Sequence, residues 1–221
     1  MSVQVKICGI NSRAAADAAA QADADFAGLV FFARSPRFVG PDQAASLAAQ
    51  MRGRCRIVAL FADASDAAIE AAVRAARPDM LQLHGGETPE RVRAIRSNFG
   101  LLVMKSISIA DAGDLVAIAR YEPVADMLLF DAKAPASADR PGGHGASFDW
   151  QLLRGRRVGV PWLLGGGLNA ANVARAIHAC DAPGVDVSSG VETGPGVKSP
   201  EMIRAFVSAA RNAQVTAEAQ A

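Results

Sequence analysis

Short runs of apolar residues, each bounded by turn-forming residues, recur along this chain and alternate with longer amphipathic segments. The runs have the length and composition of strands that are buried on both faces. They predict strands over residues 3–8, 26–32, 56–62, 80–84, 101–107, 127–131, 162–165 and 185–188. The segments between them place apolar residues three and four positions apart, which is the spacing of one helical face. They predict helices over residues 14–22, 42–51, 66–76, 89–98, 111–119, 170–180 and 200–211, and a short one near 150–153.

Strand and helix alternate to a count of eight, which is typical of one α/β fold, the (β/α)8 TIM barrel. A doubly wound open sheet usually has fewer strands and a dinucleotide-binding glycine motif after the first, and Gly9-Ile10-Asn11 is not such a motif. No linker or shift in composition divides the chain. We therefore expect a single barrel domain over residues 1–221, with a frayed tail from about residue 213. Its active site is expected on loops that follow the C-terminal ends of the strands.

Composition supports this fold and argues against several classes of partner. Hydrophobic residues make up 51% of the chain and aromatic residues only 5%, so small aliphatic side chains must build the core. The net charge is +1, from 23 basic and 22 acidic residues, and no dense run of Lys and Arg indicates nucleic-acid binding. No apolar stretch approaches the roughly 20 residues that span a bilayer, and the N-terminus lacks the layout of a secretory signal. We expect a cytoplasmic protein without a membrane or nucleic-acid partner.

The three cysteines are an odd number and lack CxxC spacing, which argues against a disulfide framework and a zinc site. Cys55 and Cys180 fit the common fate of a free cysteine, which is burial as a small apolar residue. Cys8 differs, because it ends the first predicted strand, where a thiol can act as a base. Asp131 ends the sixth predicted strand in the same way. These two strand ends therefore present a base and an acid that suit proton transfer.

Glycine-rich segments follow the last two predicted strands. Gly165-Gly166-Gly167-Leu168-Asn169 leads from the seventh strand into a helix, and Ser188-Ser189-Gly190-Val191-Glu192 follows the eighth. Glycine lets the backbone approach a phosphate closely, and N–H groups at a helix start attract negative charge. Loops after strands seven and eight form the usual phosphate site of a TIM barrel. We predict a phosphorylated small-molecule substrate that is bound by Gly166, Gly167, Ser189 and Gly190.

Seven segments of the chain carry further motifs. They are Lys6-Ile7-Cys8-Gly9-Ile10, Ser35-Pro36-Arg37-Phe38-Val39, Gln82-Leu83-His84-Gly85, Phe130-Asp131-Ala132, Gly142-Gly143 with Phe148-Asp149-Trp150, Gly166-Gly167-Leu168-Asn169 and Val185-Asp186-Val187-Ser188-Ser189-Gly190-Val191-Glu192. In content and in order they resemble the motifs of phosphoribosylanthranilate isomerase, the cofactor-independent barrel enzyme of tryptophan biosynthesis. The resemblance extends from Val3 to about Ala210.

This resemblance implies an Amadori rearrangement of N-(5-phosphoribosyl)anthranilate to 1-(2-carboxyphenylamino)-1-deoxyribulose 5-phosphate, without a cofactor or a metal. It also implies four roles. Cys8 is the general base and Asp131 the general acid, Arg37 binds the anthranilate carboxylate, and Asp186 lies beside the substrate amine.

The two catalytic roles require unusual ionisation at pH 7, because cysteine has an ordinary pKa near 8.5 and aspartate near 3.9. Burial and a neighbouring thiolate would raise the aspartate pKa, so the acid and the base are expected to titrate as a coupled pair. Lys6 shares a strand face with Cys8 and is expected to point into the barrel. Its charge either favours the Cys8 thiolate or neutralises Asp186, and the sequence leaves both open.

Some alternatives also stay open. For His84 a hydrogen-bonded structural role competes with catalysis. Family members generally carry a small hydroxyl residue where His144 stands, which puts the substrate contacts of that loop in doubt. A related isomerase that acts on a phosphoribosyl-formimino imidazole compound generally has aspartate in place of Cys8. A phosphate-binding barrel without chemistry is disfavoured by the presence of both Cys8 and Asp131. The oligomeric state, monomer or homodimer, is not determined.

Overall fold

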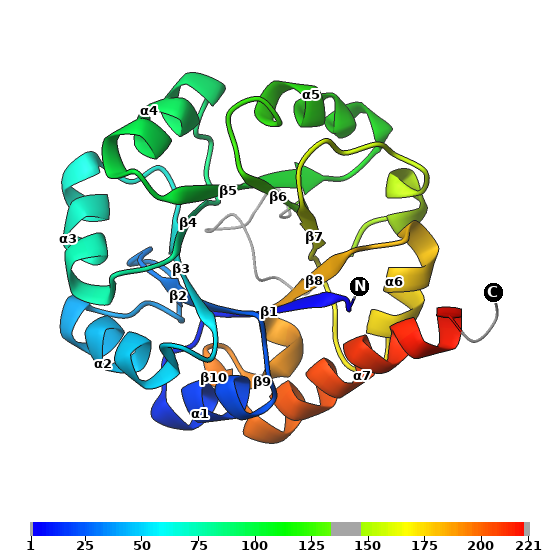
Figure 1. The fold of residues 1–221 in the computed structure, drawn as a ribbon, viewed down its shortest axis with the longest axis horizontal. Coiled ribbons are helices and arrows are strands. Elements are labelled where there is room, and N and C mark those ends of the chain that lie inside the picture. Colours follow the sequence, from blue (N-terminus) through cyan, green and yellow to red (C-terminus); the bar gives the residue numbers. More distant parts are fainter. Residues whose placement is uncertain (1, 134–146, 219–221) are drawn as a thin grey trace.

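The computed structural model describes residues 2–133 and 147–218, without the side chains of residues 214–218. Within these residues eight parallel strands pair in chain order, and β1 also pairs with β8, so that the sheet closes into a barrel. These strands are β1 (Gln4–Cys8), β2 (Phe26–Val30), β3 (Arg56–Phe61), β4 (Met80–Leu83), β5 (Leu102–Ile109), β6 (Met127–Ala132), β7 (Trp162–Leu164) and β8 (Gly184–Val187). Figure 1 shows this ring of strands inside a ring of helices. The predicted (β/α)8 TIM barrel is confirmed.

Several helices begin where the sequence supplies a capping side chain. Ser12, Ser65 and Thr88 each accept a hydrogen bond from the backbone N–H three residues further on, which stabilises the first turn. The α-helices are α1 (Arg13–Gln21), α2 (Pro41–Met51), α3 (Asp66–Ala76), α4 (Pro89–Phe99), α5 (Ala117–Tyr121), α6 (Val173–Cys180) and α7 (Pro200–Glu218). Single turns of 3-10 helix are η1 (Ala112–Val116), η2 (Trp150–Leu153) and η3 (Ser189–Val191).

The structure differs from the predicted elements in four places. The helix predicted over residues 111–119 is divided into η1 and α5, because Asp111 and Asp114 form a capping box around a tight turn. α6 begins three residues later than predicted, at Val173. α7 continues to Glu218, through residues where we expected a frayed tail. A short antiparallel hairpin, β9 (Glu192–Gly194) and β10 (Val197–Lys198), was not predicted, because its residues form no apolar run.

The inside of the barrel changes from apolar to polar along its axis. A cluster of buried apolar side chains fills the end where the strands begin, with members that include Phe26, Met80 and Met127 as the first residues of their strands. Further along the strands, Lys6, Gln82 and Ser106 are also buried, although they are polar. The remaining apolar side chains pack between the strands and the helices. The polar groups of the barrel therefore lie toward the C-terminal ends of the strands.

Aspartates close the opposite rim of the barrel. Asp25, Asp79 and Asp126 each stand directly before an even-numbered strand. Each carboxylate accepts a hydrogen bond from the backbone N–H of one residue in the preceding strand. The backbone N–H of the aspartate donates in turn to the carbonyl of that strand residue. The donors are Val5 at 2.7 Å, Ile57 at 2.6 Å and Val103 at 2.9 Å. This repeated contact joins neighbouring strands where the main-chain ladder begins.

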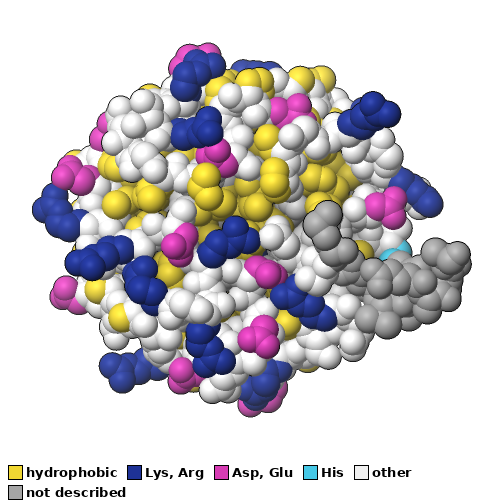
Figure 2. Space-filling view, in the orientation of Figure 1, with side chains coloured by type: hydrophobic (Ala, Val, Ile, Leu, Met, Phe, Trp, Pro, Cys, Tyr) yellow, Lys and Arg dark blue, Asp and Glu magenta, His cyan; other side chains and the backbone are white. Residues whose placement is uncertain are grey.

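The outer surface carries charges of both signs. In the part of the face that Figure 2 colours by type, apolar side chains gather near the middle, and Lys, Arg, Asp and Glu surround them. That face has no continuous basic stripe of the kind that follows a phosphate backbone. Among the described residues, no helix is both long and apolar enough to cross a membrane.

Candidate active site

Three titratable side chains meet where β1 and β8 pair. The ammonium Nζ of Lys6, which is fully buried, lies 2.8 Å from Asp186 Oδ1. Cys8 follows on the same face of β1 and is 5% exposed. A Cβ atom on Gly28 of β2 would lie 3.1 Å from Cys8 Sγ and 3.3 Å from Lys6 Nζ. The absence of a side chain at Gly28 therefore leaves room for the thiol and the ammonium. Lys6 contacts Asp186, and its positive charge also acts on the Cys8 thiol.

Opposing effects set the pKa values of Lys6 and Cys8. Burial raises the pKa of the Cys8 thiol, although the positive charges of Lys6 and Lys198 lower it. For Lys6, burial lowers the pKa, but the attraction of Asp186 and Cys8 outweighs burial and the pKa is raised. The net pKa of Cys8 is raised because desolvation of an anion costs more than the two lysines recover.

Asp131 is the penultimate residue of β6, and β7 and β8 separate it from Cys8 around the ring. One carboxylate oxygen, Oδ1, accepts a hydrogen bond from the N–H of Ala132 at 2.9 Å. The other, Oδ2, lies 3.2 Å from Nε2 of His84, the residue that follows β4. The acid and base positions predicted from the sequence thus lie on strands across the barrel from one another, as Figure 1 shows for β1 and β6.

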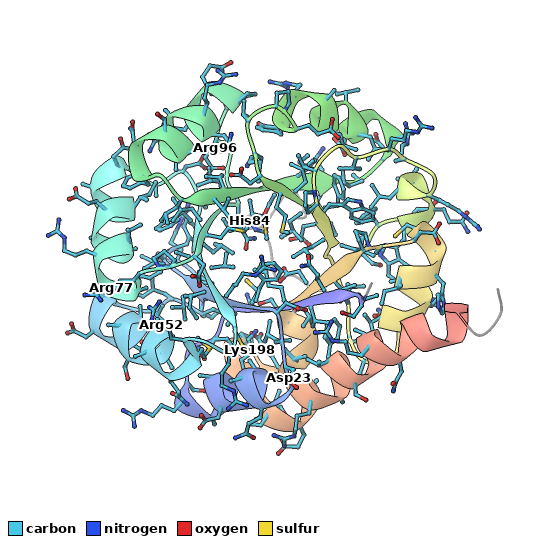
Figure 3. All side chains as sticks on the ribbon, viewed as in Figure 1. Asp23, Arg52, Arg77, His84, Arg96 and Lys198 are labelled. Atoms are coloured by element: carbon cyan, nitrogen blue, oxygen red, sulfur yellow. The ribbon has the colours of Figure 1, made fainter. Side chains whose placement is uncertain are left out.

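The His84 ring is held from its other side. Its Nδ1 lies 3.0 Å from Gln82 Nε2 and 3.1 Å from Ser106 Oγ. An amide nitrogen only donates, so Nδ1 accepts. Nε2 lies near Asp131 but makes no hydrogen bond within the described residues. Figure 3 places His84 inside the ring of strands. Its neighbours support the hydrogen-bonded role that the sequence left open, and Ser106 was missed because a lone serine in a strand carries no signal.

Arg37 is buried and does not project into solvent. Its guanidinium binds the Glu192 carboxylate with two contacts, from Nε to Oε1 at 2.7 Å and from Nη2 to Oε2 at 2.8 Å. Lys198 Nζ lies 2.7 Å from Glu192 Oε1. A Cβ on Gly9, which has a φ of +79°, would lie 2.5 Å from Arg37 Cδ, so this glycine lets the arginine cross the β1–α1 loop. Glu192 belongs to the last of the seven sequence motifs, but the motif indicated no role for it, and Lys198 carried no signal.

Burial and ion pairing compete in this cluster. For Lys198, burial lowers the pKa to about 8, although Glu192 raises it. For Glu192, burial raises the pKa, but hydrogen bonds from Arg37 and Lys198 outweigh burial and the pKa is lowered. Glu192 is therefore ionised at neutral pH between two cations.

The two glycine-rich loops lie against one another. Gly166 and Gly167 have φ angles of +85° and +64°, and a Cβ on Gly166 would lie 2.7 Å from the backbone N of Ala132. A Cβ on Gly190 would overlap the carbonyl oxygen of Leu168 in the other loop. Among the described residues, no acceptor meets the backbone N–H groups of Gly166, Gly167 and Leu168. Ser189 begins η3 in the second loop.

The first glycine-rich loop meets α6 differently from the prediction. The glycine loop does not open directly into a helix, because the Asn172 side chain accepts a hydrogen bond from Asn169 N–H and donates to the Gly167 carbonyl. These bonds hold a turn before α6 begins at Val173. The helix dipole therefore acts from further away than the sequence suggested.

The remaining sequence predictions concern the other two cysteines, metal binding and the loop at residues 142–144. Cys55 and Cys180 are buried free thiols, as predicted, and burial raises the pKa of each to about 11. Within the described part of the chain, no group of three or more His, Cys, Asp and Glu side chains could hold a metal ion. Gly142, Gly143 and His144 lie outside the described residues.

Comparison with known proteins gives consistent results. Residues 5–209 match the family described as N-(5'phosphoribosyl)anthranilate (PRA) isomerase. The N-(5'-phosphoribosyl)anthranilate isomerase of Paramagnetospirillum magneticum is 54% identical over 211 residues, which are 96% of this chain and 98% of that protein. The protein of the same name from Rhodopseudomonas palustris strain HaA2 is 53% identical over 216 residues, 98% of this chain and 99% of that one.

Solved structures agree with the sequence relatives. Phosphoribosyl anthranilate isomerase from Thermotoga maritima superimposes with a TM-score of 0.85 at 31% identity, covering 95% of this chain and 99% of that one. A phosphoribosyl anthranilate isomerase in complex with reduced 1-(o-carboxyphenylamino)-1-deoxyribulose 5-phosphate superimposes with a TM-score of 0.80 at 30% identity, with the same coverage. Because the family match spans most of the chain and relatives more than half identical align almost end to end, this chain belongs to the phosphoribosylanthranilate isomerase family of barrel isomerases.

Proposed function

We propose that this chain catalyses the Amadori rearrangement of N-(5-phosphoribosyl)anthranilate to 1-(2-carboxyphenylamino)-1-deoxyribulose 5-phosphate in tryptophan biosynthesis, with Cys8 as general base and Asp131 as general acid. The observation that carries the proposal is the family membership of a chain that holds a thiol and a carboxyl group at the ends of β1 and β6. A reduced form of the same product is bound by a solved relative.

In the first step Asp131 gives a proton to the ring oxygen of the ribose. The bond between that oxygen and C1 breaks, and the nitrogen lone pair forms a C1–N double bond, which leaves an open-chain iminium ion. A carboxyl group that serves as an acid must hold its proton until the ring oxygen accepts it. The N–H of Ala132 holds one oxygen of this carboxyl group, and His84 Nε2 lies 3.2 Å from the other.

In the second step Cys8 removes the proton from C2. The electrons of that C–H bond form a C1–C2 double bond, the iminium nitrogen recovers its lone pair, and the resulting enolamine tautomerises to the ketone. Burial raises the pKa of Cys8, so the thiol must first lose its proton to water before it can act as the base. The positive iminium ion supplies what is needed, because a nearby cation lowers the thiol pKa in the way that Lys6 and Lys198 already do.

Binding contacts are proposed for the two ends of the substrate. The phosphate is assigned to Gly166, Gly167, Ser189 and Gly190, because glycine backbone and open N–H groups suit an anion there. The anthranilate carboxylate is assigned to Arg37, because a guanidinium can bind a carboxylate with two hydrogen bonds. Asp186, paired with Lys6 at the barrel mouth, is assigned to the substrate amine.

The decisive experiment is turnover by the purified protein without added metal or nucleotide. We expect conversion of phosphoribosylanthranilate and none of the phosphoribosyl-formimino imidazole compound. Conversion of the imidazole compound alone would replace this proposal with the alternative isomerase. Absence of turnover together with phosphate binding would favour a barrel that binds without chemistry.

Two substitutions test the assignment of acid and base. Cys8→Ser and Asp131→Asn should each lower kcat by at least roughly 10²-fold, the usual contribution of acid or base catalysis, while product affinity stays nearly unchanged. Cys55→Ser, which alters a buried free thiol outside the site, is the matched control and should retain wild-type kcat. Unchanged kcat in either catalytic variant would remove that residue from the mechanism.

Four further expectations stay predictions. They are the cytoplasmic location, the single domain, the absence of a nucleic-acid partner, and a monomeric or homodimeric state.

A further inference from the structure

Glu192 stands at the centre of a buried ion cluster and has no role assigned so far. Its carboxylate binds Arg37 with two contacts and Lys198 with one. The side chains of Glu192, Arg37 and Lys198 are only 4%, 6% and 0% exposed. Two cations thus share the Glu192 carboxylate. Figure 3 shows Lys198 on the side of the molecule that carries β9, β10 and α1.

The cluster is built into the hairpin that the sequence did not predict. Glu192 on β9 is the strand partner of Lys198 on β10, and Glu192 Oε2 also accepts a hydrogen bond from Gly196 N–H in the turn at 3.3 Å. A Cβ on Gly196 would overlap the carbonyl oxygen of Pro36, the residue before Arg37. The Asn11 side chain donates to the Gly196 carbonyl at 2.9 Å. The hairpin therefore packs against both the loop that carries Arg37 and the loop that follows Cys8.

Further contacts of Lys198 extend the cluster toward Cys8, the proposed base. Lys198 Nζ donates to the Ser188 carbonyl at 2.8 Å, and Ser188 Oγ donates to the Cys8 carbonyl at 3.1 Å. The end of β8, the hairpin and the end of β1 are thus joined by polar contacts, and Lys198 is fixed by these as well as by Glu192.

We propose that Glu192 is a positioning residue, whose carboxylate fixes the Arg37 guanidinium in the orientation that receives the substrate carboxylate. The inference rests on the role proposed above for Arg37. An arginine side chain has many rotamers, and binding is weakened when those rotamers must be ordered at the moment of association. A two-pronged contact with Glu192 orders the guanidinium beforehand.

Glu192 acts through Arg37 and not by touching the substrate. Both of its oxygens are already bound, Oε1 by Arg37 and Lys198 and Oε2 by Arg37 and Gly196. Its negative charge would also repel an anionic substrate.

The test compares Glu192→Gln with Arg37→Ala, using product affinity from calorimetry and separate values of kcat and KM. Glutamine keeps the shape but cannot accept from both cations with a full charge. We expect Glu192→Gln to weaken product binding and raise KM by roughly 10- to 100-fold, the range found for residues that hold a ligating group in place, with a smaller change in kcat. Glu192→Asp, which keeps the charge, should restore part of the affinity.

The double variant Arg37→Ala/Glu192→Gln gives the sharpest readout. If Glu192 acts through Arg37, the double variant should bind product no more weakly than Arg37→Ala alone. Glu201→Gln is the matched control, because Glu201 is an exposed carboxylate on the following helix that pairs with Ser199 and Arg204, and it should bind as wild type does. Thermal unfolding checks that each variant is folded at the assay temperature.

Each outcome has one meaning. Wild-type affinity in Glu192→Gln beside lost affinity in Arg37→Ala would overturn the positioning role and leave the proposed function standing. Additive losses in the double variant would also overturn it, because Glu192 would then act on its own. Wild-type affinity in Arg37→Ala would refute the carboxylate role of Arg37 itself, and the positioning role with it.

Discussion

The acidity of Cys8 is decided by the charges on the two neighbouring strands. Burial raises its pKa, Lys6 and Lys198 lower it, and Asp186 raises it again. Lys6 and Asp186 are 2.8 Å apart, so each weakens the effect of the other on the thiol. The pKa of Cys8 therefore reflects opposing effects, and removal of one neighbouring charge should shift that pKa in a predictable direction.

Asp186→Asn should lower the pKa of Cys8, because an anion that disfavours the thiolate is removed while Lys6 remains. Lys6→Met should raise it, because the largest favourable charge is lost. The thiolate absorbance can be titrated in the ultraviolet on a Cys55→Ser/Cys180→Ser background. Asp114→Asn, a change to an aspartate that pairs with exposed Lys133, serves as the control. Shifts of the same sign in both variants would contradict this electrostatic account.

At the scale of elements, the phosphate loops depend on close approach of two backbones. Gly190 of η3 faces the carbonyl of Leu168, and the glycine at 166 faces the end of β6. Any side chain at position 190 has to separate the two loops, because a carbonyl oxygen in a held turn cannot move aside as a flexible side chain can. The spacing of the N–H groups that suit an anion therefore depends on a glycine at position 190.

Gly190→Ala should weaken binding of inorganic phosphate by about tenfold or more and lower the free energy of unfolding by about 1–3 kcal/mol, the usual cost of an added methyl group in a packed site. Gly194→Ala is the control, because nothing lies within 4 Å of a Cβ there. Calorimetry of phosphate binding and chemical denaturation measure the two effects. A folded Gly190→Ala protein with wild-type phosphate affinity would show that the loops do not bind the phosphate.

At the scale of the whole molecule, the two ends of the barrel have different roles. Polar residues inside the barrel lie toward the C-terminal ends of the strands, whereas the aspartate contacts at 25, 79 and 126 lie at the start of the even strands. In this fold the first end carries chemistry and the second carries stability. Substitutions at the second end should therefore change unfolding without changing turnover.

Asp126→Ala should lower the free energy of unfolding by about 1–3 kcal/mol, because the backbone N–H of Val103 loses its acceptor in a partly buried place. Asp79→Ala should cost less, since position 79 is exposed and water can replace the carboxylate. Denaturation measures both, with exposed Glu70→Ala on α3 as the control. The expectation fails if Asp126→Ala changes kcat or KM as strongly as it changes stability.

Much of the fold could be predicted because it is encoded locally. Apolar runs and helical spacing located the eight strands of the barrel to within a few residues, and short-range pattern needs no knowledge of distant contacts. Boundaries failed where a side chain redirected the backbone, as Asn172 does before α6. The β9–β10 hairpin was missed because it is held by Arg37, more than 150 residues away in sequence.

By itself the sequence determined the alternation of elements, the strand-end positions of Cys8 and Asp131, and the two glycine-rich loops, since each of these depends on neighbouring residues. Tertiary structure alone decided which charges meet. It pairs Lys6 with Asp186 and Arg37 with Glu192, and it buries Cys8 enough to raise the pKa of the thiol. Ion pairs and desolvation depend on distances between segments far apart in the chain, and closing the barrel sets those distances.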